Sequence, residues 1–385
     1  MNKTLTHISP SATLAIAAAA KQLAAEGKHV CDFAAGEPDF DTPQSVKDAA
    51  VKALAEGRTK YTPARGLPAL CSAISDKFKA DNNLEYAASQ IIVSGGAKMS
   101  ISTAFYALLN PGDEVLIPAP YWLSYPEMVR LAGGVPVYVK GVDETGFKIT
   151  PEQLETAITP RTTVFVLNSP SNPTGLVYSR DETAALAEVC LKHNLWIIAD
   201  EIYERMVYGG ESHTSVAAFS KAHYDRTITI NGVSKAYAMT GWRIGYAAAP
   251  APVIAAMETV QSHLASAPAT FNQFGALAAL QGAETEIRPM LAEFAKRNEL
   301  MYDLVSQIPG VVCKRPTGAF YVFPNISSFG LPSTEFANRL IRGKHVAAVP
   351  GVAFGADGNI RFSYACSDAE ITEGMKRLKE FCAGL

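Results

Sequence analysis

Between residues 90 and 250, short apolar runs rich in β-branched residues alternate with stretches of helical periodicity. These runs cover residues 91–93, 114–117, 135–139, 163–167, 196–199, 227–230 and 244–248. Alternation of this kind is typical of a mostly parallel sheet with helices on both faces. Several runs are apolar almost throughout, as expected of strands that are buried on both sides. The pattern therefore predicts an α/β protein built around a seven-stranded sheet.

The C-terminal third has a different pattern. A helical stretch from about residue 284 to 305 precedes short strand-like runs near residues 311, 320 and 360, and a last helix starts near residue 368. A chain of 385 residues exceeds the usual size of one core, so this part is predicted to form a smaller α+β domain. Residues 1–44 are too few to fold alone. We predict a large domain of residues 45–280 and a small domain of residues 1–44 and 281–385.

Composition excludes several classes of protein. The net charge of -3 and the 18% of charged residues lack the basic excess of a nucleic-acid partner. No run approaches the roughly 20 apolar residues of a membrane span, and the Ala-rich residues 12–20 read as an amphipathic helix rather than a signal. The six cysteines include no CxxC pair, which indicates reduced thiols in a cytoplasmic protein. No HExxH or GxSxG motif is present, so neither a metal site nor a serine hydrolase is expected.

Polar or glycine-containing segments follow four of the strand-like runs, at residues 94–98, 168–175, 200–203 and 231–235. Ligands of open α/β sheets bind beyond the carboxyl ends of the strands, so these segments are expected to meet at one site. The first segment has the sequence SGGAK and offers backbone amides to a phosphate at a helix N-terminus. Its spacing matches neither a Walker A loop nor GxGxxG, so taken alone it is a weak signal.

Lys235 and Arg243 are separated by eight positions around a glycine-containing turn. Most lysines are solvated surface charges, but Lys235 follows a buried run and has small or apolar neighbours. A desolvated lysine has a lowered pKa and becomes an amine nucleophile toward a carbonyl carbon. The planar guanidinium of Arg243 suits a phosphate group.

Four further side chains allow both a structural and a functional explanation. Asp200 either caps a helix or keeps a proton on the nitrogen of a bound pyridine, with Tyr203 bonding to the 3-oxygen of that ring. Asn172 belongs to a structural turn or aims its amide at a ligand. Arg361, inside an apolar β-prone segment, needs either an internal carboxylate or that of a ligand.

Taken in this order, the segments resemble the fold-type I aminotransferases of class I over essentially the whole chain. The matching segments are residues 36–43, 60–66, 120–126, 168–175, 200–203, 234–245 and 316–321, together with Arg361. Within that family the chain is most similar to bacterial aspartate aminotransferases that recognise the distal carboxylate with a lysine. The resemblance implies a pyridoxal-phosphate-dependent transaminase that transfers an amino group from an L-amino acid, aspartate above all, to 2-oxoglutarate in a ping-pong reaction.

The resemblance assigns the cofactor contacts. Lys235 would carry pyridoxal 5′-phosphate as a Schiff base and move the proton between the substrate and the cofactor. Asp200 would bind the pyridine nitrogen, Tyr203 and Asn172 the 3-oxygen, and Trp122 would stack on the ring. The phosphate would be bound by the backbone amides of Gly96, Ala97 and Lys98, with Arg243 and Ser234 beside it. Tyr61 would reach the phosphate from the other subunit of a homodimer with shared active sites.

The resemblance also assigns the contacts to the amino acid and oxo acid substrates. The α-carboxylate would be bound by Arg361, with Gly36, Trp122 and Asn172 beside it. Lys98, Ser11 and Thr13 are the expected contacts of a second carboxylate. The chain departs from the family at two positions. Gly232 stands where many relatives have a phosphate-binding serine, and Ser9 stands where prephenate-accepting relatives have a lysine.

Other functions on the same residues stay open at this point. An aminotransferase of aromatic or broad specificity would need the same cofactor site. A pyridoxal-phosphate-dependent lyase would keep Lys235, Asp200 and Arg361 but favour elimination. A regulator that binds the cofactor without catalysis would need a DNA-binding module, for which residues 1–40 show neither a helix-turn-helix nor a basic face.

Overall fold

The computed structural model describes residues 6, 8, 12–142 and 146–385. Its central feature is a seven-stranded sheet with the strand order β2-β8-β7-β6-β5-β3-β4. The strands are β2 (Ile91–Ser94), β3 (Glu114–Ala119), β4 (Val135–Lys140), β5 (Thr162–Asn168), β6 (Trp196–Asp200), β7 (Thr227–Gly232) and β8 (Gly245–Ala248). Each of the seven runs predicted between residues 90 and 250 is a strand with its limits within two residues, so the α/β fold class is confirmed.

The direction of β8 distinguishes it from the other strands. Neighbouring strands run parallel, except that β8 is antiparallel to both β7 and β2. A parallel return needs a crossover connection that usually contains an α-helix. Residues 233–244 instead form turns and the short 3-10 helix η5 (Thr240–Trp242), so the chain re-enters the sheet in the opposite direction. This connection carries Lys235 and Arg243 at the carboxyl end of β7.

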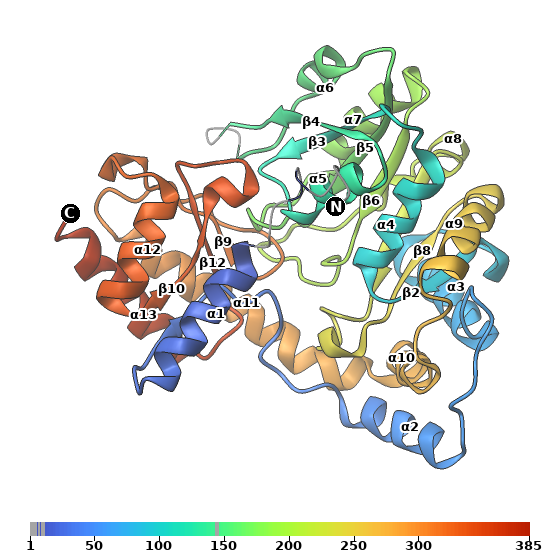
Figure 1. The fold of residues 1–385 in the computed structure, drawn as a ribbon, viewed down its shortest axis with the longest axis horizontal. Helices are drawn as coiled ribbons and strands as arrows, with labels where there is room; N and C mark the ends of the chain where they lie inside the picture. The colour runs from blue at the N-terminus through green and yellow to red at the C-terminus, as the bar shows by residue number, and fades with distance from the viewer. Residues whose placement is uncertain (1–5, 7, 9–11, 143–145) are drawn as a thin grey trace.

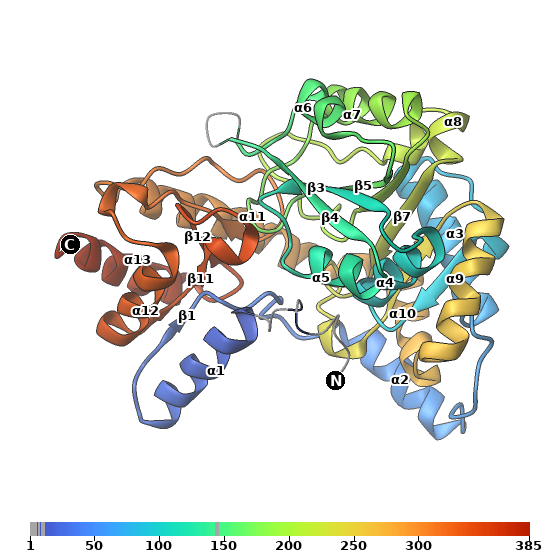
Figure 2. The same cartoon turned by 45° about the horizontal axis from the view of Figure 1, so that its top comes forward.

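Two layers of helices cover the sheet because side chains alternate between its faces along each strand. Val115 and Ile117 share an apolar core with helices on one face, while Leu116 packs against helices on the other. The first layer consists of α4 (Ala97–Leu108), α5 (Ser124–Leu131) and α9 (Ala251–Leu264), and the second includes α6 (Pro151–Ala157) and α7 (Arg180–Lys192). Figure 2 shows the sheet between these layers.

The remaining helices of this part pack around the β2 edge of the sheet or extend away from it. They are α2 (Gln44–Ala55), α3 (Pro68–Asn82), α8 (Lys221–Tyr224) and α10 (Thr270–Gly282). Helices α2 and α10 lie side by side at the end of the molecule farthest from the C-terminus (Figure 1).

The C-terminal elements form a separate group with the first helix of the chain, on the left in Figure 1. The group contains α1 (Ala12–Ala25), β1 (Cys31–Asp32), α11 (Glu284–Ser306), β9 (Tyr321–Val322), α12 (Ser333–Lys344), β10 (Val346–Ala347), β11 (Val349–Pro350), β12 (Ile360–Ser363) and α13 (Asp368–Cys382). Strand β1 pairs in parallel with β10, and β12 lies between β11 and β9 in an antiparallel sheet. The run near residue 311 forms only an isolated bridge between Val312 and Asn325. The domain limits at residues 45 and 280 stay a prediction, and the pairing of β1 with β10 is consistent with it.

Local sequence explains several helix ends. Ser179 and Glu182 form a capping box at α7, in which the Ser179 hydroxyl accepts from the Glu182 amide and the Glu182 carboxylate accepts from the Ser179 amide. Ser367 caps α13 by accepting from the Glu370 amide at 3.2 Å. All six cysteines are free thiols. Within the described residues, none of the helices has the length and apolar character needed to cross a membrane.

Candidate active site

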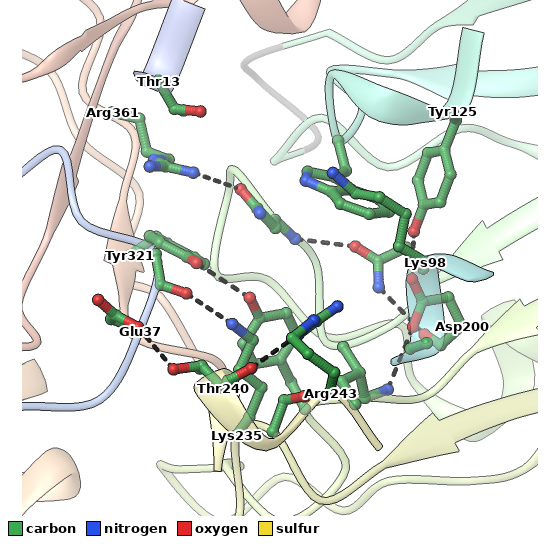
Figure 3. Close-up of a pocket in the computed structure, with 18 residues that line it drawn as sticks. Thr13, Glu37, Lys98, Tyr125, Asp200, Lys235, Thr240, Arg243, Tyr321 and Arg361 are labelled. Atoms are coloured by element: carbon green, nitrogen blue, oxygen red, sulfur yellow. Dashed lines mark hydrogen bonds between the residues drawn. The ribbon is translucent and has the colours of Figure 1, made fainter. Parts of the chain in front are cut away.

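A pocket of about 340 Å³ lies at the carboxyl ends of β5, β6 and β7, where the sheet faces the C-terminal group (Figure 3). Side chains from distant parts of the sequence meet there. Its lining residues are Thr13, Gly36, Glu37, Ala97, Lys98, Trp122, Tyr125, Asn168, Asn172, Asp200, Ile202, Tyr203, Ser234, Lys235, Thr240, Arg243, Tyr321 and Arg361. Twelve of the predicted site residues are among them, so the sequence prediction and the pocket coincide.

Lys235 extends into the pocket from the turn that follows β7. Its ammonium group donates a hydrogen bond of 2.6 Å to the carbonyl oxygen of Gly36. Burial lowers the pKa of Lys235 to about 8, with smaller contributions from Arg361 and Arg243, while Glu37 acts in the opposite direction. With such a pKa about a tenth of the molecules carry a neutral amine at pH 7, which is far more than for an ordinary lysine. The neutral amine is the form that attacks a carbonyl carbon.

Asp200 ends β6 and is 4% exposed. Burial raises its pKa to about 6, although the Tyr125 hydroxyl donates to its carboxylate at 2.6 Å and thereby favours the ionised form. The other carboxylate oxygen accepts from the amide of Ile202 at 3.3 Å. Turns rather than a helix follow Asp200, so the helix-cap explanation does not apply. A buried carboxylate with few donors suits a cationic partner supplied by a ligand.

A polar network behind Asp200 fixes the segment that carries it. Lys77 pairs with Glu204, whose second oxygen accepts from the Asn82 amide at 2.7 Å. Asn82 also donates to the Ser215 hydroxyl at 2.8 Å, and Ser215 donates to Glu201 at 2.6 Å. Because Glu201 and Glu204 flank the segment from residue 202 to 203, the network limits the movement of Asp200 and Tyr203.

Arg361 lies on β12 and is 2% exposed. One of its terminal nitrogens donates to the side-chain oxygen of Asn172 at 3.0 Å, and the other donates to the carbonyl of Ala34 at 2.8 Å. Its Nε is buried and has no hydrogen-bond partner in the part of the chain that the structure describes. Among the described residues, no carboxylate forms an ion pair with Arg361, which removes the internal acid considered from the sequence. A buried guanidinium with neutral partners and an unused donor favours a carboxylate ligand.

Two tyrosines meet between Arg361 and Lys235. The hydroxyl groups of Tyr203 and Tyr321 lie 2.9 Å apart in a hydrogen bond, and both side chains are buried. Burial and the neighbouring Tyr321 phenol raise the pKa of Tyr203, so its hydroxyl keeps the proton. Tyr203 is therefore a hydrogen-bond donor available to an anionic ligand oxygen.

A cradle for an anion lies at the start of α4. The first amides of a helix have no carbonyl partner within the helix, and those of Ala97 and Lys98 are in this position. Gly96 precedes them with φ +90°, and a Cβ at this residue would lie 2.2 Å from Arg243. Ser234 and Arg243 also line the pocket, and Arg243 donates to the carbonyl of Gly95 at 3.3 Å. Glycine is thus required for the close approach of the guanidinium.

Lys98 is exposed and borders the pocket, with its ammonium 5.0 Å from the centre of the Trp122 ring. Partial burial and Arg243 lower its pKa. Thr13 lines the pocket, whereas Ser9 and Ser11 lie outside the described residues. At Gly232, a Cβ would come within 3.0 Å of the Gly245 backbone in β8, so a serine there would crowd the paired strand.

Comparison with known proteins gives the family. Residues 28–378 match the model of class I and II aminotransferases. The chain belongs to this family. It is 50% identical to the aspartate aminotransferase of Geobacillus stearothermophilus over 384 residues, with 98% of each chain covered. It is 48% identical to the aspartate/prephenate aminotransferase of Cereibacter sphaeroides, with coverage of 100% of this chain and 99% of that protein.

Solved aminotransferase structures are similar to the whole chain. The aspartate aminotransferase of Thermus thermophilus with maleate has a TM-score of 0.95 at 41% identity, and the alignment covers 99% of each chain. The aromatic aminotransferase of Pyrococcus horikoshii has a TM-score of 0.90 at 37% identity, with 95% of this chain and 99% of that chain covered. The predicted fold type and the predicted aminotransferase class are confirmed.

Some pocket residues of this aminotransferase had no role in the sequence prediction. They are Glu37, Tyr125, Asn168, Ile202, Thr240 and Tyr321. Tyr125 packs edge-on against Trp122 with ring centres 5.2 Å apart, but its hydrogen bond to Asp200 joins residues 75 positions apart and so has no local sequence signal. Tyr61 is 96% exposed and does not line the pocket of its own chain.

Proposed function

We propose that the chain transfers the amino group of aspartate to 2-oxoglutarate with pyridoxal 5′-phosphate as its cofactor. The observation that carries the proposal is one pocket that holds a lysine of lowered pKa, a buried aspartate and a buried arginine with neutral partners. The relatives at 50% and 48% identity are named for aspartate, which favours this donor.

The chemistry of the pocket fits pyridoxal phosphate at each end. Asp200 would hold the proton on the pyridine nitrogen, and the cradle of Gly96, Ala97 and Arg243 would bind the phosphate. Trp122 would cover the ring, with the backbone amide of Lys98 and the side chain of Ser234 near the phosphate. When bound, the cofactor supplies an electron sink for the pair of electrons left on the substrate carbon.

The other pocket side chains have separate roles in the proposed reaction. Lys235 would form the covalent link to the cofactor and then move the proton at the Cα atom of the substrate. Tyr203 and Asn172 would donate to the ring's 3-oxygen. Arg361, beside Gly36, would fix the α-carboxylate and so determine which bond of Cα faces the ring. Lys98 and Thr13, together with Ser11, would bind the second carboxylate.

A homodimer with shared active sites belongs to the same proposal. Tyr61, Val51, Leu54 and Leu264 are large apolar side chains with exposures of 96%, 64%, 46% and 56%. Gathered into one patch, such side chains would mark a contact with another subunit. Tyr61 would then contact the phosphate bound by the partner subunit. The cytoplasmic location is also proposed, on the basis of the six free thiols.

A half-reaction tests the proposal. Purified holoprotein is mixed with aspartate in the absence of any oxo acid, and oxaloacetate, free ammonia and the absorbance spectrum are recorded. One oxaloacetate for each cofactor, a lasting change of the spectrum and reversal by 2-oxoglutarate are expected. Continuous release of ammonia and oxo acid without an acceptor would identify a lyase instead.

A further inference from the structure

Residues 34–37, which we call the strap, border the pocket and are held by three active-site side chains. Figure 3 shows Glu37 beside Thr240. Arg361 donates to the carbonyl of Ala34 at 2.8 Å. Lys235 donates to the carbonyl of Gly36 at 2.6 Å. The hydroxyl of Thr240 donates to the carboxylate of Glu37 at 2.6 Å. The strap therefore contacts both the proposed carboxylate site and the reactive lysine.

Thr240, the partner of Glu37, also contacts the residues at the proposed phosphate site. Thr240 begins η5, and its carbonyl oxygen accepts from Arg243 at 2.7 Å. Arg243 also donates to the carbonyl of Gly95 at 3.3 Å, directly before the cradle. Glu37, Thr240 and Arg243 thus connect the strap to the proposed phosphate site through side chains of adjacent elements.

The three contacts differ in what the proposed reaction requires of them. Lys235 has to leave the Gly36 carbonyl when its nitrogen binds the cofactor. Arg361 gains a carboxylate ligand that competes for its donors. The contact between Thr240 and Glu37 involves neither Lys235 nor Arg361, so it persists through the reaction.

We propose that Glu37 is a positioning residue that fastens the strap to Thr240 while the reaction occupies Lys235 and Arg361. In this role Glu37 keeps the Gly36 backbone beside the substrate carboxylate and touches no reacting atom. The inference rests on the proposed role of Lys235.

The negative charge of Glu37 offers a competing explanation, because Lys98, Lys235, Arg243 and Arg361 make the pocket cationic. Replacement of Glu37 by glutamine distinguishes the hydrogen-bond explanation from the charge explanation. Glu37→Gln keeps an oxygen that accepts from Thr240 and removes only the charge. Glu37→Ala and Thr240→Val both remove the hydrogen bond, and Thr240→Val leaves the carboxylate in the chain.

The first measurement compares steady-state kinetics of the holoenzymes. Glu37→Ala and Thr240→Val should each raise KM for aspartate by about fivefold, with a smaller change in kcat, because one hydrogen bond that holds the substrate site is lost. Their double variant should be no worse than either single variant. Glu37→Gln should restore KM to within about twofold of wild type. Asp41→Asn is the matched control, since this carboxylate is 99% exposed and follows the strap without entering the pocket.

The second measurement follows amide hydrogen exchange in a peptide that covers the strap and requires no turnover. Loss of the Thr240–Glu37 hydrogen bond, in Glu37→Ala or Thr240→Val, should accelerate amide exchange in the strap. The acceleration should be larger in the holoprotein than in the cofactor-free protein, where Lys235 still binds the Gly36 carbonyl. Equal KM losses in Glu37→Gln and Glu37→Ala would overturn the proposal in favour of a charge effect. Unchanged KM and exchange in Thr240→Val would overturn it as well. A Lys235→Ala enzyme that still transaminates would refute the proposed function and leave the role of Glu37 to be judged from the exchange measurement.

Discussion

Replacement of Asp200 by asparagine should stabilise the cofactor-free protein while it removes transamination. The carboxylate is 4% exposed, and burial raises its pKa to about 6 from an ordinary value of 3.8. The folded protein therefore disfavours the ionised form that prevails at neutral pH. Asparagine has nearly the same shape and carries no charge to desolvate, so it avoids this penalty.

The size of the effect follows from the pKa difference. One pKa unit corresponds to 1.36 kcal/mol, so ionised Asp200 costs about 3 kcal/mol of unfolding free energy at pH 7. Because the folded-state pKa is the higher one, the cost is absent below pH 3.8, grows through the interval up to pH 6 and is complete above it. At pH 5 it should be about half as large. With about 2.1 cal/mol/K per residue over 385 residues, the melting temperature should rise by about 4 °C at pH 7.

Thermal unfolding of the cofactor-free proteins at pH 5 and pH 7 measures this difference, with Asp41→Asn as the exposed control. Asp200→Asn should melt above wild type, by a larger margin at pH 7 than at pH 5. It should also bind pyridoxal phosphate more weakly, since the anionic partner of the pyridine nitrogen is lost. A lower melting temperature than wild type at pH 7 would show that Asp200 contributes to stability and would refute the reasoning.

Three further variants test other parts of the site. Lys98→Ala should lower kcat/KM for aspartate by an amount that corresponds to about 1–3 kcal/mol of transition-state stabilisation. The loss of kcat/KM for phenylalanine or tyrosine should be much smaller, because only aspartate presents a second carboxylate; equal losses for both substrate classes would assign the Lys98 side chain to the phosphate. Arg361→Lys should raise KM for every amino acid at least tenfold, because one ammonium cannot replace the two parallel donors of a guanidinium; a change confined to dicarboxylic substrates would show that Arg361 binds the second carboxylate and not the α-carboxylate. Tyr61→Phe should lose cofactor affinity without a change in the monomer–dimer equilibrium, as measured by equilibrium dialysis and sedimentation; unaltered cofactor binding would remove Tyr61 from the shared site.

The sequence predicted the sheet and the loops that meet at its edge, since both depend on local patterns. Apolar runs located all seven strands, and the segments after them contain Asn172, Asp200 and Lys235. The antiparallel direction of β8 follows from a connection whose turns have no periodic signal. Arg361 was the most informative single residue, because an arginine in an apolar strand requires a partner wherever the strand lies.

The residues that sequence reasoning missed depend on tertiary placement. Thr240 and Glu37 are separated by about two hundred positions, and neither has an unusual local context. Tyr321 contacts Tyr203 only because β9 and the turn after β6 face the same pocket. A partner for Tyr61 requires a second chain, which no pattern within one sequence describes.

The proposed role of Lys235 is tested most directly by locating the cofactor on the chain. Reduction of the holoprotein with borohydride makes the link between pyridoxal phosphate and its lysine permanent, and mass spectrometry of the peptides then identifies that lysine. We expect one modified residue per chain, Lys235, and no modification after Lys235→Ala. Modification of Lys98 or of any other lysine in place of Lys235 would contradict it.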